Sequence, residues 1–406
     1  MRTHHQTASG NHAHSPSGVT RRQVLAGLGA VGTMTAAAGL PGGSLLQPVG
    51  PRFGQEAAGQ PPLFRLERVT ENVYAAIARP AMLVNCNAAI IVGSDHLLVV
   101  DSHSKPSAAR ALLAQVRSEI GDRPVRYIIN THFHWDHAQG NAVYPNTFGM
   151  KADIVASTAT REWLAREGTS RLRQQLESLS RQVETLRRQL AQATDEDQRQ
   201  QLVNQIGEIE AYIKEMTPPQ ITLPTITFDD RLVIHDGTRE IHLLFLGRGH
   251  TAGDIVVYVP SERVVATGDL LQGMLPYLGD GYPEEWPQTL AALERLDFTR
   301  VVPGHGAVEH DKSVVAFMRA YIEELVELVK RGIERGASLE ELRRTLLPDQ
   351  FRSLMTGGQG ERVQRETVAV FGPTRAPSLA AGVARTVTEV YTYFTRRKPE
   401  RSSRGE

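Results

Sequence analysis

Residues 131–141, THFHWDHAQGN, place three histidines and one aspartate within six positions, directly after the apolar segment VRYIIN. Alternate residues of an extended segment point to the same side, so His132 and His134 face one side and can bind a single ion. Asp136 and His137 come at the turn that follows and can reach a second ion nearby. Clustered histidines are otherwise costly, because charged rings repel one another and buried neutral rings need partners. The segment therefore predicts half of a metal site at the end of a strand.

Three further candidate ligands occur later in the chain, each just past the end of an apolar segment. His250 lies in GRGHTAGD after LLFL, Asp269 lies in ATGD after RVV, and His305 lies in PGHG after VV. Loops at strand ends are typical places for chemistry, because rigid strands fix their positions. The single cysteine, Cys86, excludes a thiolate cluster, so every ligand must be an imidazole or a carboxylate. Such ligands suit zinc first, with iron or manganese as alternatives.

Short β-branched segments alternate with amphipathic ones from about residue 67 onward, which predicts an α/β (α+β) fold. Strands are predicted at residues 72–77, 87–93, 96–102, 125–130, 153–157, 226–237, 239–247, 254–260, 263–269 and 300–306. Helices are predicted at residues 107–121, 287–296, 313–333, 338–347 and 378–396.

Residues 163–219 differ in texture, because their apolar residues recur at steps of three and four, as in a coiled coil. The repeat consists of Leu172, Leu176, Leu179, Val183, Leu186 and Leu190 and, after the polar TDED, of Leu202, Ile206, Ile209 and Ile213. This pattern predicts an antiparallel helical hairpin inserted between two strands. Three roles stay open for it: a solvated strut, a lid over a site, or an arm that forms a homodimer.

The N-terminal residues have the layout of an export signal. No acidic residue precedes Glu56, and the arginine pair of TRRQVLA is followed by an uncharged run rich in Ala and Gly at residues 24–40. We interpret residues 1–40 as a twin-arginine signal peptide with a small-residue cleavage site. The run is too weakly apolar for a comfortable transmembrane anchor, so we expect a periplasmic or secreted protein with no stable membrane anchor after cleavage. Residues 41–66, rich in Gly, Pro and Gln, are predicted to be a flexible lead-in.

Taken in order, the motifs HxHxDH, GHT, GD and PGHG resemble the metal motifs of the metallo-β-lactamase-fold superfamily over roughly residues 67–310. The resemblance implies an αββα sandwich, in which two mixed sheets lie face to face, helices cover them and the site lies at one edge. It implies one domain at residues 67–312 that includes the helical insertion, followed by a C-terminal helical extension at residues 313–406.

The resemblance also implies a site for two zinc ions. The implied ligands are His132, His134 and His250 for the first ion, Asp136, His137 and His305 for the second, and Asp269 as a bridge between them. Asp101, in VVDS, matches an aspartate that supports such ligands from behind. A water shared by two cations forms hydroxide near neutral pH. The implied catalytic aspartates are Asp136, which orients this hydroxide, and Asp269.

Asp269 separates branches of the superfamily. True β-lactamases generally lack a bridging aspartate, so the ligand set resembles that of glyoxalase II-like hydrolases, lactonases and many phosphodiesterases. We expect an exported dinuclear-zinc hydrolase of a small ester, thioester, lactone, amide or phosphodiester. The alternatives are a mononuclear iron persulfide dioxygenase, a true β-lactamase, or a non-catalytic scaffold whose hairpin recruits a partner. Basic and acidic residues both number 45, so net charge gives no sign of a nucleic-acid partner.

Other polar and aromatic residues have simpler interpretations. His103 follows the Asp101 motif and is expected to have a loop role, and Cys86 is expected to be a small buried residue. Trp135 is expected to wedge the ligand loop in place. Tyr277 and Tyr282 are candidates for the substrate pocket.

Overall fold

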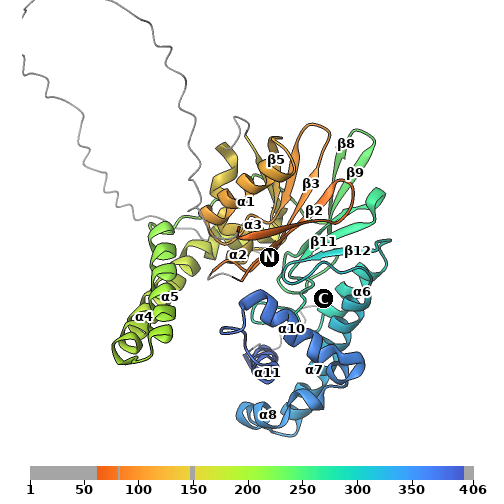
Figure 1. The fold of residues 1–406 in the computed structure, drawn as a ribbon. Coiled ribbons are helices and arrows are strands. Elements are labelled where there is room, and N and C mark those ends of the chain that lie inside the picture. The colour runs from red at the N-terminus through yellow and green to blue at the C-terminus, as the bar shows by residue number, and fades with distance from the viewer. Residues whose placement is uncertain (1–61, 81–82, 147–150, 397–406) are drawn as a thin grey trace, which may run out of the picture. The chain divides into compact units, whose positions relative to one another are not determined.

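Two β-sheets lie face to face in the computed structural model, which describes residues 62–80, 83–146 and 151–396 (Figure 1). The first sheet has the strand order β1-β2-β3-β4-β5-β6-β7; β1 to β4 pair antiparallel, and β4 to β7 pair parallel. Its strands are β1 (Phe64–Arg68), β2 (Val73–Ala78), β3 (Ala88–Val92), β4 (Leu97–Val100), β5 (Val125–Ile129), β6 (Asp153–Ser157) and β7 (Ile226–Phe228).

The second sheet has the strand order β12-β11-β10-β9-β8, with β11 and β12 parallel and the other pairs antiparallel. Its strands are β8 (Arg231–Asp236), β9 (Arg239–Phe245), β10 (Ile255–Val259), β11 (Val264–Gly268) and β12 (Arg300–Pro303). Both sheets are therefore mixed, as the sequence predicts.

Helices cover the outer faces of the sandwich, whereas the two helices of the insertion project away from it (Figure 1). Before the second sheet come α1 (Pro106–Glu119), α2 (Trp135–Ala138), α3 (Thr158–Trp163), α4 (Thr169–Gln192) and α5 (Glu196–Glu215). After β11 come α6 (Trp286–Glu294), α7 (Ser313–Glu334), α8 (Leu339–Thr345), α9 (Arg352–Met355), α10 (Gln359–Phe371) and α11 (Leu379–Arg396).

Three hydrophobic layers hold these elements together. Alternate strand residues point to opposite faces of a sheet, so Ala89 and Ile91 of β3 pack toward the second sheet while Ile90 packs toward α1. On the other side, Leu325 of α7 and Val387 of α11 are fully buried in one cluster with Val256 and Val265 of the second sheet. The arrangement confirms the predicted αββα sandwich. The helices after residue 313 share a core with that sandwich and form its outer layer.

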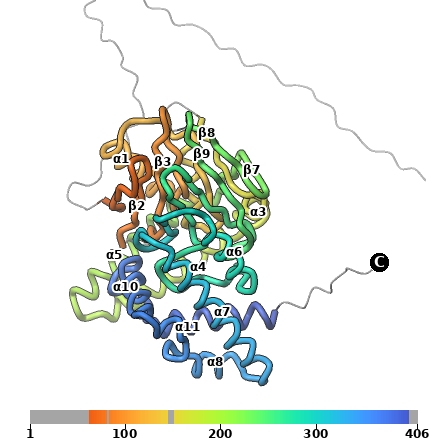
Figure 2. The backbone as a smooth tube through the Cα atoms, turned by 90° about the vertical axis from the view of Figure 1, so that its right-hand side faces the viewer, coloured from red at the N-terminus to blue at the C-terminus, as the bar shows by residue number. Residues whose placement is uncertain are grey.

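The C-terminal helices α7, α8, α10 and α11 gather at one end of the molecule in both views (Figures 1 and 2). Apolar residues of α7 recur at steps of three and four, which places them on one buried face. Arg362 of α10 pairs with Glu309, which lies between β12 and α7. Glu366 of α10 accepts a hydrogen bond from the Ala307 N–H (3.0 Å), one residue beyond the PGHG motif. This group of helices is thereby fixed directly to a candidate ligand loop.

The helical insertion consists of α4 and α5, which lie side by side and apart from the sheets along most of their length (Figure 1). Val183 and Leu186 of α4 are buried against Ile206 and Ile209 of α5, as the heptad spacing predicts. Nearer the sandwich, Leu172 and Leu176 are buried with Tyr212 and Met216. Supercoiling and the role of a dimerisation arm stay predictions.

The structure corrects three details of the sequence reading. Strand β1 begins at Phe64 and overlaps the predicted lead-in at 41–66, because the buried Phe64 ring packs into the outer core of the first sheet. The predicted strand 226–237 is two strands, because the chain crosses from β7 in the first sheet to β8 in the second. Helices α2, α3, α9 and α10 were not predicted; α2 and α9 are short, and the Gly-rich stretch before α10 obscures its start.

The predicted signal peptide at residues 1–40 lies outside the described residues. Within residues 62–80, 83–146 and 151–396, no helix combines the length and the apolar character needed to cross a membrane.

If α7 belongs to the core, shortening one of its buried leucines destabilises the whole chain. We expect Leu325→Ala to lower the free energy of unfolding by about 2–5 kcal/mol, because it leaves a cavity in the hydrophobic cluster that α7 shares with α11 and the second sheet. The matched control is Leu347→Ala, whose side chain is 46% exposed and should change stability by less than about 0.5 kcal/mol. Urea denaturation followed by circular dichroism measures both. Equal effects would contradict the shared core.

Candidate metal centre

The structure brings all seven predicted ligands together at one edge of the sandwich, where strands of both sheets end. His132 and His134 follow β5, Asp136 and His137 lie in the short helix α2, and His250 lies in the loop before β10. Asp269 directly follows β11, and His305 follows β12 by two residues. Their possible ligand atoms form two groups, each with all atoms within 4.8 Å of one another. The four-residue group is His132, His134, His250 and Asp269, and the three-residue group is Asp136, His137 and His305.

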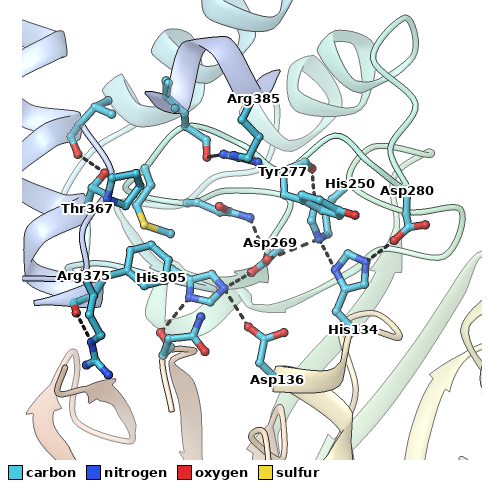
Figure 3. Close-up of a pocket in the computed structure, with 18 of the residues that line it drawn as sticks. His134, Asp136, His250, Asp269, Tyr277, Asp280, His305, Thr367, Arg375 and Arg385 are labelled. Atoms are coloured by element: carbon cyan, nitrogen blue, oxygen red, sulfur yellow. Dashed lines mark hydrogen bonds and ion pairs between the residues drawn. The ribbon is translucent and has the colours of Figure 1, made fainter. Parts of the chain in front are cut away.

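The Asp269 carboxylate lies between the two groups (Figure 3). Its Oδ1 is 3.1 Å from Nε2 of His137 and 3.2 Å from Nε2 of His305. Its Oδ2 is 3.4 Å from Nε2 of His250 and accepts a hydrogen bond from the Gln272 amide at 2.8 Å. One carboxylate thus presents an oxygen to each group, which is the geometry that a bridging ligand needs.

Hydrogen bonds to the outer nitrogens orient the two buried rings nearest β5. His137 Nδ1 donates to Asp101 Oδ2 (2.7 Å), which leaves Nε2 facing Asp269. The Thr131 hydroxyl donates its only hydrogen to Asp101, so it accepts from Nδ1 of His132 (3.0 Å). Nε2 of His132 is then left unprotonated, which is the form that binds a cation. Asp101 therefore holds His137 directly and His132 through Thr131.

The other three rings are oriented in the same manner. Nδ1 of His250 donates to the Tyr277 carbonyl (3.0 Å), and Nδ1 of His305 donates to the Asn85 carbonyl (2.8 Å). His134 is turned around: its Nε2 donates to Asp280 (3.0 Å), and its Nδ1 lies 2.7 Å from Nε2 of His250. Every ring thus has one nitrogen held by the protein and one facing the cluster.

Unpaired polar atoms show that the cluster fits a cation. Among the residues that the structure describes, His132 Nε2, His137 Nε2 and Asp269 Oδ1 are buried without a hydrogen-bond partner. Buried polar atoms are rarely left in this state unless a ligand satisfies them. Imidazole nitrogens and carboxylate oxygens, without sulfur, suit a divalent metal such as zinc.

Burial and neighbouring charges lower the pKa of some rings of the site and raise that of another. Burial lowers the pKa of His250 to about 3 and that of His132 well below its usual value, so both rings are neutral at pH 7. Burial also lowers the pKa of His137, but the charges of Asp269, Asp101 and Asp136 raise it more, and the result is a pKa above the usual range. A cation placed among these carboxylates therefore competes with protons, and its binding releases them.

Backbone conformation at the strand ends explains the glycines of two motifs. Gly268 has φ +50°, and a Cβ there would lie 2.2 Å from the Thr131 hydroxyl oxygen. A Cβ on Gly304 would lie 2.0 Å from Oδ1 of Asp269. Asp101 and His103 are non-glycine residues at φ 67° and 68°, a conformation that costs energy and is found at functional sites. These positions let three loops approach one another around the Asp269 carboxylate.

The cluster opens into a cavity of about 610 Å³. One wall is apolar and combines the loop after Asp269 with helices α10 and α11 (Figure 3). The apolar and basic residues of the cavity lining are Trp135, Met274, Leu275, Tyr277, Val363, Phe371, Pro377, Leu379, Arg171, Arg375 and Arg385. The cavity can therefore hold a molecule with an apolar part close to the two groups.

The structure also places the residues with simpler predicted roles. Tyr277 lines the cavity, whereas Tyr282 packs under the Arg248 guanidinium, 4.3 Å from the ring centroid. His103 is buried behind the site, 3.0 Å from Cys86 Sγ and stacked on Phe64. Trp135 lines the cavity and also packs edge-on against Tyr212 of α5. Its ring therefore forms part of the cavity wall and also supports the ligand loop.

Sequence reasoning missed several polar residues of the site. Asp280 binds His134, Gln272 binds Asp269, and Asp254 accepts hydrogen bonds from Thr251 that shape the His250 loop. Burial raises the pKa of Asp254 to about 7, although the bonds from Thr251 lower it. Two signals in the sequence could have revealed these aspartates. Asp280 lies between two glycines in LGDG, and Asp254 is the last residue of GHTAGD.

Comparison with known proteins identifies similar chains. The family model described as "Metallo-beta-lactamase superfamily" matches residues 81–305. The linear primary-alkylsulfatase of Pseudomonas sp. (strain ATCC 19151) is 26% identical over 267 residues, which are 62% of this chain and 48% of that protein. The chain thus spans about half the length of this curated relative. A solved metallo-beta-lactamase from Pontibacter korlensis is similar with a TM-score of 0.47 and 17% identity, over 64% of this chain and 99% of that chain.

We expect His103 to make the stability of the metal-free protein depend on pH. Burial, with a smaller effect of the His137 charge, lowers its pKa to about 3, while the unfolded chain binds the proton near pH 6.5. The stabilisation is complete above pH 6.5 and is lost as the pH falls toward 3. We expect the free energy of unfolding of the wild type to fall between pH 7 and pH 5. In His103→Asn this fall should be smaller by on the order of 1–2 kcal/mol. Asparagine tolerates the positive φ of this position.

Urea denaturation of the metal-free protein at several pH values measures this dependence. The control is His235→Asn, because the His235 side chain is 69% exposed and should leave the pH dependence unchanged. A wild-type slope that His103→Asn leaves unaltered would contradict the prediction.

Proposed function

The chain belongs to the metallo-beta-lactamase superfamily, and we propose that it is a metal-dependent hydrolase with two zinc ions, one at each ligand group. The position of the Asp269 carboxylate carries this proposal. It presents one oxygen to His250 of the four-residue group and the other to His137 and His305 of the three-residue group. Each of the five rings has its outer nitrogen held by the protein and its other nitrogen facing the cluster, which supports a pair of neighbouring ions.

When bound, two zinc ions lower the pKa of a shared water and polarise the bond under attack. The chain's own residues provide the arrangement around them. Gln272 donates a hydrogen bond to Oδ2 of the Asp269 carboxylate. Asp101 holds the His137 ring directly and the His132 ring through Thr131. Asp136, whose Oδ2 lies 3.4 Å from His305 Nε2, is placed to accept a hydrogen bond from the attacking water and to orient it.

For the substrate we propose an ester of an apolar alcohol with a small anionic acid, a sulfuric ester in the first instance. The relative from Pseudomonas is named a linear primary-alkylsulfatase. The cavity supports the same class, because Met274, Leu275 and Phe371 form an apolar surface beside the ligand groups. Hydrolysis adds water across the ester, so the alcohol takes up one hydrogen and the acid leaves as sulfate with release of a proton.

The ligand set supports two ions and an aspartate bridge over the other readings. All seven positions are occupied by His or Asp and lie together, which favours two metals over a single iron. An aspartate at the bridging position disfavours a dedicated β-lactamase, in line with the resemblance of the motifs. We also propose export by the twin-arginine route, on the basis of the arginine pair and the apolar run at residues 24–40.

Metal analysis combined with a substrate panel tests the proposal. We expect about two zinc ions per chain and turnover of medium-length alkyl sulfates, measured as sulfate release, above that of thioesters, lactones, β-lactams and phosphodiesters. Asp269→Ala should lose at least one zinc ion and reduce turnover at least about 100-fold, because even partners behind a ligand are worth 10–100-fold. His235→Ala, an exposed histidine of β8, is the matched control and should change neither quantity.

Other outcomes have definite readings. One iron per chain with oxygen uptake would contradict the dinuclear hydrolase. Two zinc ions with preferred turnover of a thioester or a lactone would retain the hydrolase and overturn the sulfuric ester as its substrate.

A further inference from the structure

His134 differs from the other four rings of the site in the way it is held. Those four rings present Nε2 to the cluster, whereas His134 presents Nδ1, 2.7 Å from His250 Nε2. Its Nε2 points away from the cluster and donates to Asp280 Oδ2 at 3.0 Å (Figure 3). Asp280 lies in the loop between β11 and α6. The orientation of this one ring therefore depends on a carboxylate far from it in sequence.

Asp280 is held in turn by the helical insertion. Its Oδ1 accepts a hydrogen bond from Arg171 Nη2 at 2.7 Å, and Arg171 lies in the first turn of α4. The side chains become more exposed along this series, at 14% for His134, 20% for Asp280 and 51% for Arg171. A continuous chain of hydrogen bonds thus runs from the ligand cluster to the surface of the insertion.

A second contact joins the insertion to the same ligand segment. The Trp163 ring, at the end of α3, stacks on Phe133 with a centroid distance of 3.8 Å and an angle of 8°. Phe133 lies between His132 and His134 in the chain, and the Arg171 guanidinium lies 5.4 Å from the Trp163 ring. Trp163 and Arg171 flank a turn of π-helix at Leu164–Gly168, a type of irregularity that often marks functional sites. The base of the insertion is therefore packed against the ligand segment.

We propose that Asp280 is a positioning residue for His134 and that Arg171 holds Asp280, so that the helical insertion sets the orientation of one metal ligand. The inference rests on the proposed function insofar as His134 binds a metal. A carboxylate that accepts a hydrogen bond from the outer nitrogen of a ligand histidine fixes the tautomer and orientation of the ring and makes its other nitrogen a stronger metal ligand. The Arg171–Asp280 bond is charge-assisted and keeps that carboxylate in place.

A purely structural reading makes a different prediction. An ion pair with a half-exposed arginine adds little to folding stability. If the pair were only structural, its loss would therefore change neither stability nor metal binding by much. The proposed role appears instead in metal affinity and in the spectrum of a bound ion. These quantities separate the two readings without any assay of turnover.

The experiment titrates zinc against a chelator and records the absorption spectrum of the cobalt(II)-substituted protein. We expect Asp280→Ala to weaken binding of one of two zinc ions by about 10–100-fold and to shift the cobalt bands of that site. Asp280→Asn keeps the shape of the side chain but loses its charge, and should weaken the same ion to a smaller extent. Arg171→Met should weaken it by several-fold, and Arg171→Lys should restore part of the loss because it keeps the charge.

Arg187→Met is the matched control, because Arg187 forms a similar bond with Glu210 (2.6 Å) in the same hairpin, away from the ligand groups. It should leave affinity and spectrum unchanged. Denaturation of the metal-free variants should give midpoints equal to wild type. If Asp280→Ala lowers the denaturation midpoint, the zinc affinity and the cobalt spectrum of the isosteric Asp280→Asn variant decide between the positioning role and the structural role.

Three results overturn the inference and can be told apart. A wild type that binds two ions, together with Asp280 variants of unchanged affinity and spectrum, leaves the proposed function intact and removes the positioning role. A wild type that binds no zinc removes the proposed function and this inference with it. An equal effect of Arg187→Met would also overturn it, because the response would then belong to the hairpin charge in general.

Discussion

The buried Asp269 carboxylate and the histidine rings that converge on it are the interaction on which the rest of the structure depends. Burying so many polar groups costs free energy unless each is paired. The chain meets this cost for one nitrogen of every ring. The acceptors are Asp101, Asp280, the Thr131 hydroxyl and the backbone carbonyls of Tyr277 and Asn85. The atoms that face the cluster are not all paired: Nε2 of His132 and of His137 and Oδ1 of Asp269 have no hydrogen-bond partner in the part of the chain that the structure describes. This pattern favours a fold that is rigid around the site and leaves the pairing to a cation.

The sandwich provides that rigidity because strands of both sheets end at the same edge. Asp101 follows β4 and the HxHxDH segment follows β5 in the first sheet, while Asp269 and His305 follow β11 and β12 in the second. The hydrophobic layer between the sheets fixes the distance between these ends. Helix α10 then reaches the His305 loop through Glu366, so the outer helical layer both supports a ligand loop and forms a wall of the cavity.

The sequence predicts those parts of the site that are local and misses those that depend on distant partners. The HxHxDH motif and the strand-end positions of His250, Asp269 and His305 are visible as spacing, because each lies beside a strand with a clear pattern. Asp280 is not visible in this way: it lies 146 positions from His134 and 109 from Arg171. The same limit applies to residues 226–237, where a continuous strand pattern gives no sign that the chain changes sheets at Asp229 and Asp230.

The helical insertion adds an influence on the site that the two sheets alone do not provide. The rings of His132, His137, His250 and His305 are held by residues outside the insertion. The His134 ring, in contrast, relies on Asp280, which the insertion holds through Arg171. Arg171 also lines the main cavity and a smaller one of about 200 Å³ at the base of α4. A change in the hairpin therefore acts on both the ligand geometry and the cavity wall. Because the hairpin lies outside the sandwich core, such changes can alter the site at little cost to the stability of the fold.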